Sequence, residues 1–131
     1  MRRGDAMSRG AVLVVEDHGV ARQALACVLE ASGYAVRQAA TAADALASAA
    51  DGNVALVLLD LGLPDADGIE VVRRLRADPG TRSIPVVALT GRGEEWGEVC
   101  GGEGCAAFLT KPVAPRQLLA TVARLVGAPG A

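Results

Sequence analysis

The sequence VALVLLD at residues 54–60 decides the fold, because it joins six consecutive apolar residues to an aspartate. A short run that is rich in Val and Leu and apolar at every position is typical of a strand buried on both faces of a parallel sheet. An unpaired carboxylate at the end of such a strand would cost free energy. Asp60 is therefore expected to have a metal ion or a cationic side chain as its partner.

Four other short apolar runs are predicted to form strands. They span residues 11–15, 34–39, 84–89 and 106–109, and the run at 34–39 has the weakest pattern. Helical patterns alternate with these runs. The predicted helices extend from Val20 to a stop at Gly33, from a cap at Thr41 to Ala50, from Ile69 to a stop before Pro79, and from Pro115 to Gly127.

The alternation of strands and helices predicts a (βα)₅ chain. With right-handed crossovers it forms an α/β, doubly wound fold, in which a five-stranded parallel sheet carries helices on both faces. The fourth helix should lie between Thr90 and Lys111, where six glycines limit it to about two turns around residues 94–100. Ligands of such folds bind outside the carboxyl ends of the strands.

Length and composition bound the class of protein. The 131 residues are expected to form one domain at 11–126, between a tail at 1–10 and a second tail at 127–131. A formal net charge of -2 without a Lys/Arg run argues against direct nucleic-acid binding. No apolar stretch reaches the roughly 18 residues of a membrane span, and no signal peptide is recognised, so a cytoplasmic location is expected. The three cysteines form no Cys-x-x-Cys pair and are expected to be free thiols.

Polar side chains follow four of the predicted strands, at the ends that meet at one edge of the sheet. They are Glu16, Asp17, Asp60, Thr90, Thr110 and Lys111. Carboxylates, hydroxyls and an ammonium at one edge are suited to bind a hard cation and a phosphoryl group. Lys111 is the most informative of them, because it is the single lysine among 13 basic residues. Its compact charge suits an ion pair with a carboxylate that is phosphorylated at times.

Taken singly, several of these residues have other interpretations. Glu16 and Asp17 could form a helix N-cap, and Thr90 could be an ordinary hydroxyl at a strand end. His18 follows the acidic pair, but it is interpreted as a solvated residue of the first helical turn rather than as a ligand. The combination of positions supports a site more strongly than any one of them.

At these positions the sequence resembles the receiver domains of two-component response regulators. Four stretches carry the resemblance: VLVVED at 12–17, LLDLGLPDADG at 58–68, ALT at 88–90 and FLTKP at 108–112. They occur in the family's order and at close to its spacing, and they bracket nearly the whole chain between the tails. The resemblance implies the flavodoxin-like strand order 2-1-3-4-5.

The resemblance also implies a metal site around a phosphoacceptor. Asp60 would accept the phosphoryl group and, together with Asp17, bind Mg²⁺ or Mn²⁺ directly. Glu16 would act through a metal-bound water, and the backbone carbonyl of Gly62 would complete the protein ligands. Such a domain is expected not to be an enzyme for other substrates, but to catalyse its own phosphorylation and dephosphorylation.

The remaining implied roles concern the phosphoryl group and the response to it. Thr90 would donate a hydrogen bond to a phosphoryl oxygen, Lys111 would form an ion pair with it, and Phe108 would be the switch aromatic. The surface around the fourth helix, the fifth strand and the fifth helix would then change. Pro64 and Gly68 would shape the loop after the phosphoacceptor.

The expected donor is the phosphohistidine of a sensor histidine kinase or phosphotransfer protein, and the expected target is an unknown output protein or domain. A pseudo-receiver that acts only in protein binding is the alternative, but it predicts the loss of an acidic or lysine position, and none is lost. A phosphatase of the haloacid dehalogenase type would need Asp-x-Asp at the nucleophile, where this chain has Asp60-Leu-Gly62.

Overall fold

One five-stranded sheet organises the molecule, seen here in a computed structural model that describes residues 10–63, 65, 67–91 and 104–129. The strands are β1 (Ala11–Val15), β2 (Val36–Ala39), β3 (Val54–Asp60), β4 (Val86–Thr90) and β5 (Ala107–Thr110). The described helices are α2 (Gly19–Ala31), α3 (Ala42–Asp51), α4 (Gly68–Ala77) and α6 (Pro115–Val126).

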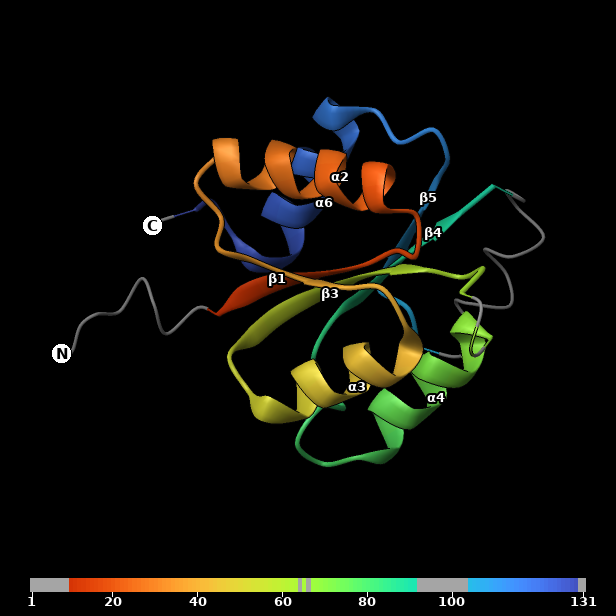
Figure 1. Ribbon diagram of the computed structural model, residues 1–131. Coiled ribbons are helices and arrows are strands. Elements are labelled where there is room, and N and C mark those ends of the chain that lie inside the picture. Colours follow the sequence, from red (N-terminus) through yellow and green to blue (C-terminus); the bar gives the residue numbers. More distant parts are fainter. Residues whose placement is uncertain (1–9, 64, 66, 92–103, 130–131) are drawn as a thin grey trace, which may run out of the picture.

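All strand pairs are parallel, and their order is β2-β1-β3-β4-β5. Helices α2 and α6 cover one face of the sheet, and α3 and α4 cover the other (Figure 1). The predicted doubly wound α/β fold with strand order 2-1-3-4-5 is therefore confirmed. The predicted short helix at 94–100 lies outside the described residues.

The central strands β1, β3 and β4 are almost entirely buried, as their Val and Leu runs predict, whereas the edge strands β2 and β5 include polar or exposed residues. Leu13 and Leu59 belong to the core layer shared with α3 and α4, whereas their neighbours Val14 and Leu58 belong to the layer shared with α2 and α6. All four side chains are 0% exposed. Successive side chains of a strand point to opposite faces, so a strand covered on both sides must be apolar at every position.

The helix ends follow the predicted local signals. Thr41 is the N-cap of α3, and its hydroxyl oxygen accepts a hydrogen bond from the amide of Asp44 at 3.1 Å. Pro115 occupies the first turn of α6, where its missing amide hydrogen has no intrahelical partner to lose. Gly33 follows α2 with φ of 101°, a conformation that glycine adopts without strain.

Three strands begin later than predicted, at Val36, Val86 and Ala107 instead of residues 34, 84 and 106. The backbone amide of Tyr34 is used to close α2, since it donates to the carbonyl of Leu29 at 3.1 Å. The amide of Ile84 donates in the same way to a carbonyl in the turn after α4. These apolar residues pack on the core without joining the sheet, which a hydropathy pattern does not distinguish.

The two described cysteines, Cys27 and Cys105, differ in oxidation state. Cys27 is an exposed free thiol, as predicted. Cys105 is disulfide-bonded, so the prediction of free thiols is wrong for this residue. The absence of a Cys-x-x-Cys motif argues against a zinc site or a disulfide framework, but it does not exclude a single bridge. In the described part of the chain, no helix has both the length and the apolar character needed to cross a membrane.

Candidate functional site

The predicted site residues converge at the carboxyl-terminal edge of the sheet. Glu16 and Asp17 follow β1, Asp60 ends β3, Thr90 ends β4, and Lys111 follows β5. Since the strands are parallel and adjacent in the order β1-β3-β4-β5, residues far apart in the chain meet at this edge.

Lys111 lies at the centre of the charges in the site. Its Nζ atom is 2.8 Å from Oε1 of Glu16 and 3.3 Å from Oδ2 of Asp60. Both carboxylates are buried, whereas about a third of the lysine side chain, 34%, is exposed. Burial alone would lower the pKa of Lys111, but its hydrogen bond and ion pairs with the two carboxylates raise the pKa above its ordinary value. The ammonium therefore stays charged and joins the two acids.

Asp60 is held as a carboxylate with a defined orientation. Its Oδ1 atom accepts a hydrogen bond from the amide of Gly62 at 3.0 Å, and Oδ2 faces Lys111. Burial would raise the pKa of Asp60, but the Gly62 amide, hydrogen bonding with Glu16 and the Lys111 ammonium together lower it. A Cβ atom at Gly62 would lie 3.6 Å from Oδ1, so a side chain at that position would stand directly beside the acceptor oxygen.

Asp17 carries an oxygen that suits a cation. Its Oδ1 atom is buried and has no hydrogen-bond partner among the described residues, and the Nδ1 atom of His18 lies 3.5 Å from it. A buried oxygen without a hydrogen bond is costly unless a ligand compensates it. Ligand atoms of Glu16, Asp17 and His18 lie within 4.8 Å of one another. Carboxylate and carbonyl oxygens are the donors that Mg²⁺ and Mn²⁺ prefer. The residues present therefore fit a hard divalent cation.

The acidic pair has two basic neighbours, His18, which was expected to be solvated, and Arg22, whose contact was not predicted. His18 is the N-cap of α2, so neither Glu16 nor Asp17 caps that helix. The His18 side chain is exposed, and its Nδ1 atom lies 3.2 Å from Oε2 of Glu16. Arg22, one turn into α2, donates from Nη1 to the backbone carbonyl of Glu16 at 2.9 Å. A basic residue one helical turn after an acidic pair was the available sequence signal for this contact.

Thr90 and Phe108 lie on the neighbouring strands β4 and β5. Thr90 is buried, and its backbone carbonyl accepts from the amide of Lys111 at 2.8 Å. Phe108 lies on β5 beside Ala88 of β4 and is 39% exposed. A Cβ atom at Gly91 would meet no atom of the described residues within 4 Å. Thr110, whose hydroxyl was grouped with the site, is exposed.

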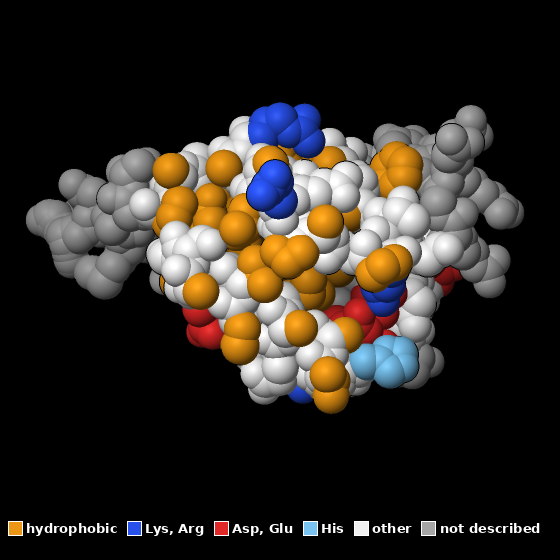
Figure 2. All heavy atoms as spheres, turned by 90° about the horizontal axis from the view of Figure 1, so that it is seen from above, with side chains coloured by type: hydrophobic (Ala, Val, Ile, Leu, Met, Phe, Trp, Pro, Cys, Tyr) orange, Lys and Arg blue, Asp and Glu red, His pale blue; other side chains and the backbone are white. Residues whose placement is uncertain are grey.

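The surface next to the acids is hollowed. Figure 2 shows acidic side chains gathered in a depression beside the histidine and flanked by apolar side chains. A cavity of about 490 Å³ lies between α2 and the turn after β5, with Leu25 and Val113 among its apolar lining residues and Glu16 and Lys111 among its polar ones. The charged site thus opens beside an apolar wall.

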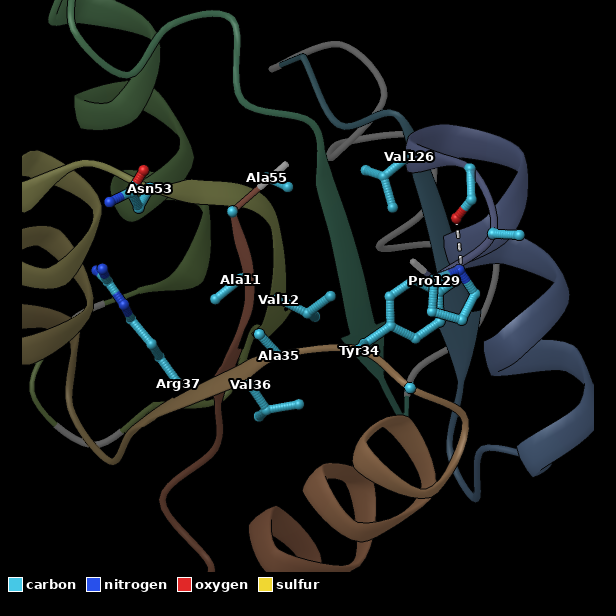
Figure 3. Close-up of a pocket in the computed structure, with 14 residues that line it drawn as sticks. Ala11, Val12, Tyr34, Ala35, Val36, Arg37, Asn53, Ala55, Val126 and Pro129 are labelled. Carbon is cyan, nitrogen blue, oxygen red and sulfur yellow. Dashed lines mark hydrogen bonds between the residues drawn. The ribbon is translucent and has the colours of Figure 1, made fainter. Parts of the chain in front are cut away.

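A second cavity, of about 520 Å³, is lined by residues at the opposite edge of the sheet (Figure 3). Two of its polar side chains are hydrogen-bonded: the Tyr34 hydroxyl donates to the carbonyl of Gly127 at 2.9 Å, and Nη1 of Arg37 donates to the carbonyl of Ser48 at 3.2 Å. Residues 127–129 lie along this cavity rather than apart from the domain. Of the predicted site residues, Glu16 and Lys111 line the first cavity, and none lines the second.

The geometry agrees with a known family. A family model described as the response regulator receiver domain matches residues 12–123. The chain belongs to this family. The receiver domain is 40% identical over 110 residues to the phosphate regulon transcriptional regulatory protein PhoB of Pseudomonas aeruginosa, an alignment that covers 83% of this chain and 48% of that protein. It thus spans about half the length of that transcriptional regulator.

Solved structures resemble the receiver domain over nearly its whole length. A putative response regulator from Chloroflexus aurantiacus has a TM-score of 0.85 at 29% identity, with coverage of 89% of this chain and 97% of that one. The receiver domain of the sensor histidine kinase PA1611 from Pseudomonas aeruginosa has a TM-score of 0.83 at 29% identity, with coverage of 91% and 98%, and holds a magnesium ion coordinated in its active site cleft.

Proposed function

We propose that Asp60 accepts a phosphoryl group from the phosphohistidine of a sensor histidine kinase or phosphotransfer protein. The observation that carries this proposal is the arrangement of Lys111, which joins the buried carboxylates of Glu16 and Asp60, while Oδ1 of Asp17 accepts no hydrogen bond from the described residues. The ammonium of Lys111 thus lies beside the acceptor, and the carboxylates of Glu16, Asp17 and Asp60 could bind a divalent metal ion as a second cation.

The transfer is a displacement at phosphorus. An oxygen of the Asp60 carboxylate attacks the phosphorus atom, a P–O bond forms, the P–N bond to the donor histidine breaks, and the imidazole nitrogen takes up a proton. Lys111 offsets the negative charge of the phosphoryl oxygens, and the Gly62 amide holds the carboxylate in one orientation. The chain thereby catalyses its own modification. Dephosphorylation is a separate hydrolysis, in which water attacks the phosphorus atom, the P–O bond to Asp60 breaks, and inorganic phosphate leaves with the carboxylate restored.

Mg²⁺ or Mn²⁺ would be held by Asp17 and Asp60 directly, by Glu16 through water, and by the backbone carbonyl of Gly62. When bound, the ion would neutralise charge on the transferring group. The donor set supports this assignment, because it consists of oxygens from two adjacent acids and from the strand end beside them.

Phosphorylation would be read through Thr90 and Phe108. The acyl phosphate carries about 1.5 to 2 negative charges where the carboxylate carries one, so it can attract the Thr90 hydroxyl. Ala88, two residues before Thr90, lies beside Phe108 across the β4–β5 pair. A shift at the end of β4 would therefore reach β5, which is part of the expected switching surface with α6.

The partners are proposed on the same basis. The receiver unit at 11–126 would act in the cytoplasm on an output protein or on an output domain of a longer chain. Supporting this proposal, the chain spans about half of a relative that is named as a transcriptional regulator. The apolar wall of the cavity beside Lys111 offers the phosphoryl donor a surface next to the acceptor.

Intact-mass spectrometry tests the proposal. Acetyl phosphate with Mg²⁺ should add one phosphoryl group to the protein, and both Asp60→Asn and excess chelator should prevent the addition. Asp51→Asn is the matched control, because it removes an exposed carboxylate of α3. Labelling of Asp60→Asn at the parent rate would exclude Asp60 as the acceptor. No labelling of the parent protein by any donor would favour the pseudo-receiver.

A further inference from the structure

The loop after Asp60 is attached to a helix that the proposed chemistry does not use. The carboxylate of Asp65 accepts hydrogen bonds from the amides of Ala42 at 2.8 Å and Ala43 at 3.2 Å, the first two residues of α3. Both hydrogen bonds lower the pKa of Asp65, and the one from the amide of Ala42 has the larger effect. The contact joins segments that are more than 20 residues apart in the sequence.

This contact adds to the N-cap of α3. Thr41 already serves as its N-cap and satisfies the amide of Asp44. The first amides of a helix have no intrahelical acceptor, and Asp65 supplies oxygens for two that Thr41 does not take. The residue therefore uses the helix end as an anchor for its own loop.

The loop is fixed at its other end by packing. The carbonyl of Leu61 accepts from the amide of Gly68 at 3.3 Å, and a Cβ atom at Gly68 would lie 2.6 Å from the Cα atom of Leu61. Leu63 is buried. Gly62 lies between these two leucines, is itself exposed, and donates its amide to Asp60. Gly62 thus lies between two buried leucines, and Asp65, three residues later, is hydrogen-bonded to α3.

We infer that Asp65 is a positioning residue of the divalent cation site. By tying the loop to α3, it holds the peptide groups around Gly62 in the arrangement that a small cation with strict coordination geometry needs. This inference rests on the proposed function, because it takes the Gly62 carbonyl as a metal ligand. Asp65 itself touches neither the cation nor the phosphoryl group.

The test compares cation affinity with stability in three variants. Mg²⁺ and Mn²⁺ binding is measured by NMR titration of the unphosphorylated protein, and stability by urea unfolding, for Asp65→Ala, Asp65→Asn and Thr41→Ala. Asp65→Ala should weaken cation binding about tenfold, as loss of an outer partner of a metal site does. Asp65→Asn keeps one acceptor oxygen and should lie between this variant and the parent.

Thr41→Ala separates positioning from helix capping. It removes a cap of the same helix without touching the loop, so it should lower stability and leave cation affinity within about twofold of the parent. Equal weakening by Asp65→Ala and Thr41→Ala would reduce Asp65 to a helix cap and overturn the inference. Parent-like affinity in Asp65→Ala would overturn it as well.

The outcomes also separate this inference from the proposed function. If Asp60→Asn blocks labelling and Asp65→Ala binds Mg²⁺ like the parent, the inference alone fails. If the parent binds neither ion and is not labelled, both fail. Where Asp65→Ala does not fold, Asp65→Asn decides, because it changes the charge and one acceptor while keeping the size of the side chain.

Discussion

Replacing Lys111 with methionine should leave two buried carboxylates without their cation. The ammonium lies 2.8 Å from Glu16 and 3.3 Å from Asp60. Removing one partner of a fully buried ion pair costs about 3–5 kcal/mol. Since 34% of the lysine side chain is exposed, water replaces part of the interaction, and we expect a loss of about 2–3 kcal/mol in the free energy of unfolding.

Urea unfolding at neutral pH without divalent cation measures this loss. With a slope of about 2 kcal/mol per molar urea, the midpoint of Lys111→Met should fall by about 1–1.5 M. Lys111→Arg keeps the charge and should lose less. Arg116→Met removes an exposed cation from α6 and controls for the change in net charge. Its midpoint should stay close to that of the parent.

The dependence on pH and on metal identifies the cause of the loss. In the parent, Asp60 has a lowered pKa in the folded state, so its stabilising effect is complete above the unfolded pKa and disappears as the pH falls through the folded one. The deficit of Lys111→Met should shrink over the same acidic range, because protonation removes the uncompensated charge. Mg²⁺ should also shrink it. An unchanged midpoint, or a deficit independent of both pH and Mg²⁺, would refute the reasoning.

Three further outcomes are expected. Lys111→Arg should still be phosphorylated but should lose the change in partner binding, measured with and without acetyl phosphate, since the guanidinium has a different reach; a parent-like change would remove the special role of the ammonium. Gly68→Ala should cost about 1–3 kcal/mol in urea unfolding because its Cβ would meet Leu61, whereas Gly91→Ala should stay within about 0.5 kcal/mol; equal costs would contradict the close approach. The amide signal of Ala42 should titrate in NMR at a pH below the ordinary aspartate pKa, since its hydrogen bond lowers the pKa of Asp65. The stabilisation of the fold by this bond is present at higher pH and is lost as the pH falls through the lowered pKa. A titration at the ordinary aspartate pKa would exclude the bond in solution.

Local sequence was sufficient for the alternation of strands and helices among the described residues, whereas the strand order was implied by the family resemblance. Short apolar runs predicted the five strands, and capping residues such as Thr41 and Pro115 predicted the helix starts. These features depend on side chains and backbone within a few residues, so they can be predicted from the local sequence. The strand starts at 34 and 84 were wrong because an apolar residue packs equally well in a turn, and only the destination of its amide hydrogen bond separates the two cases.

The site was predictable as a set of residues but not as a set of contacts. Parallel strands must bring their carboxyl ends to one edge, so the acids after β1 and β3 and the lysine after β5 were expected to meet. That Lys111 lies closer to Glu16 than to Asp60 was not expected, nor was the buried Oδ1 of Asp17 that accepts no hydrogen bond from the described residues. Strand order alone does not give these distances.

The sequence by itself therefore determined the strand and helix content and the chemical groups at the sheet edge. Tertiary structure alone decided how these groups are partnered. Arg22 reaches the carbonyl of Glu16, and Asp65 reaches the first amides of α3 across more than 20 residues. Hydrogen bonds of this kind depend on where whole elements pack, and an exposed aspartate in a loop has the same local sequence signal whether it faces water or the end of a neighbouring helix.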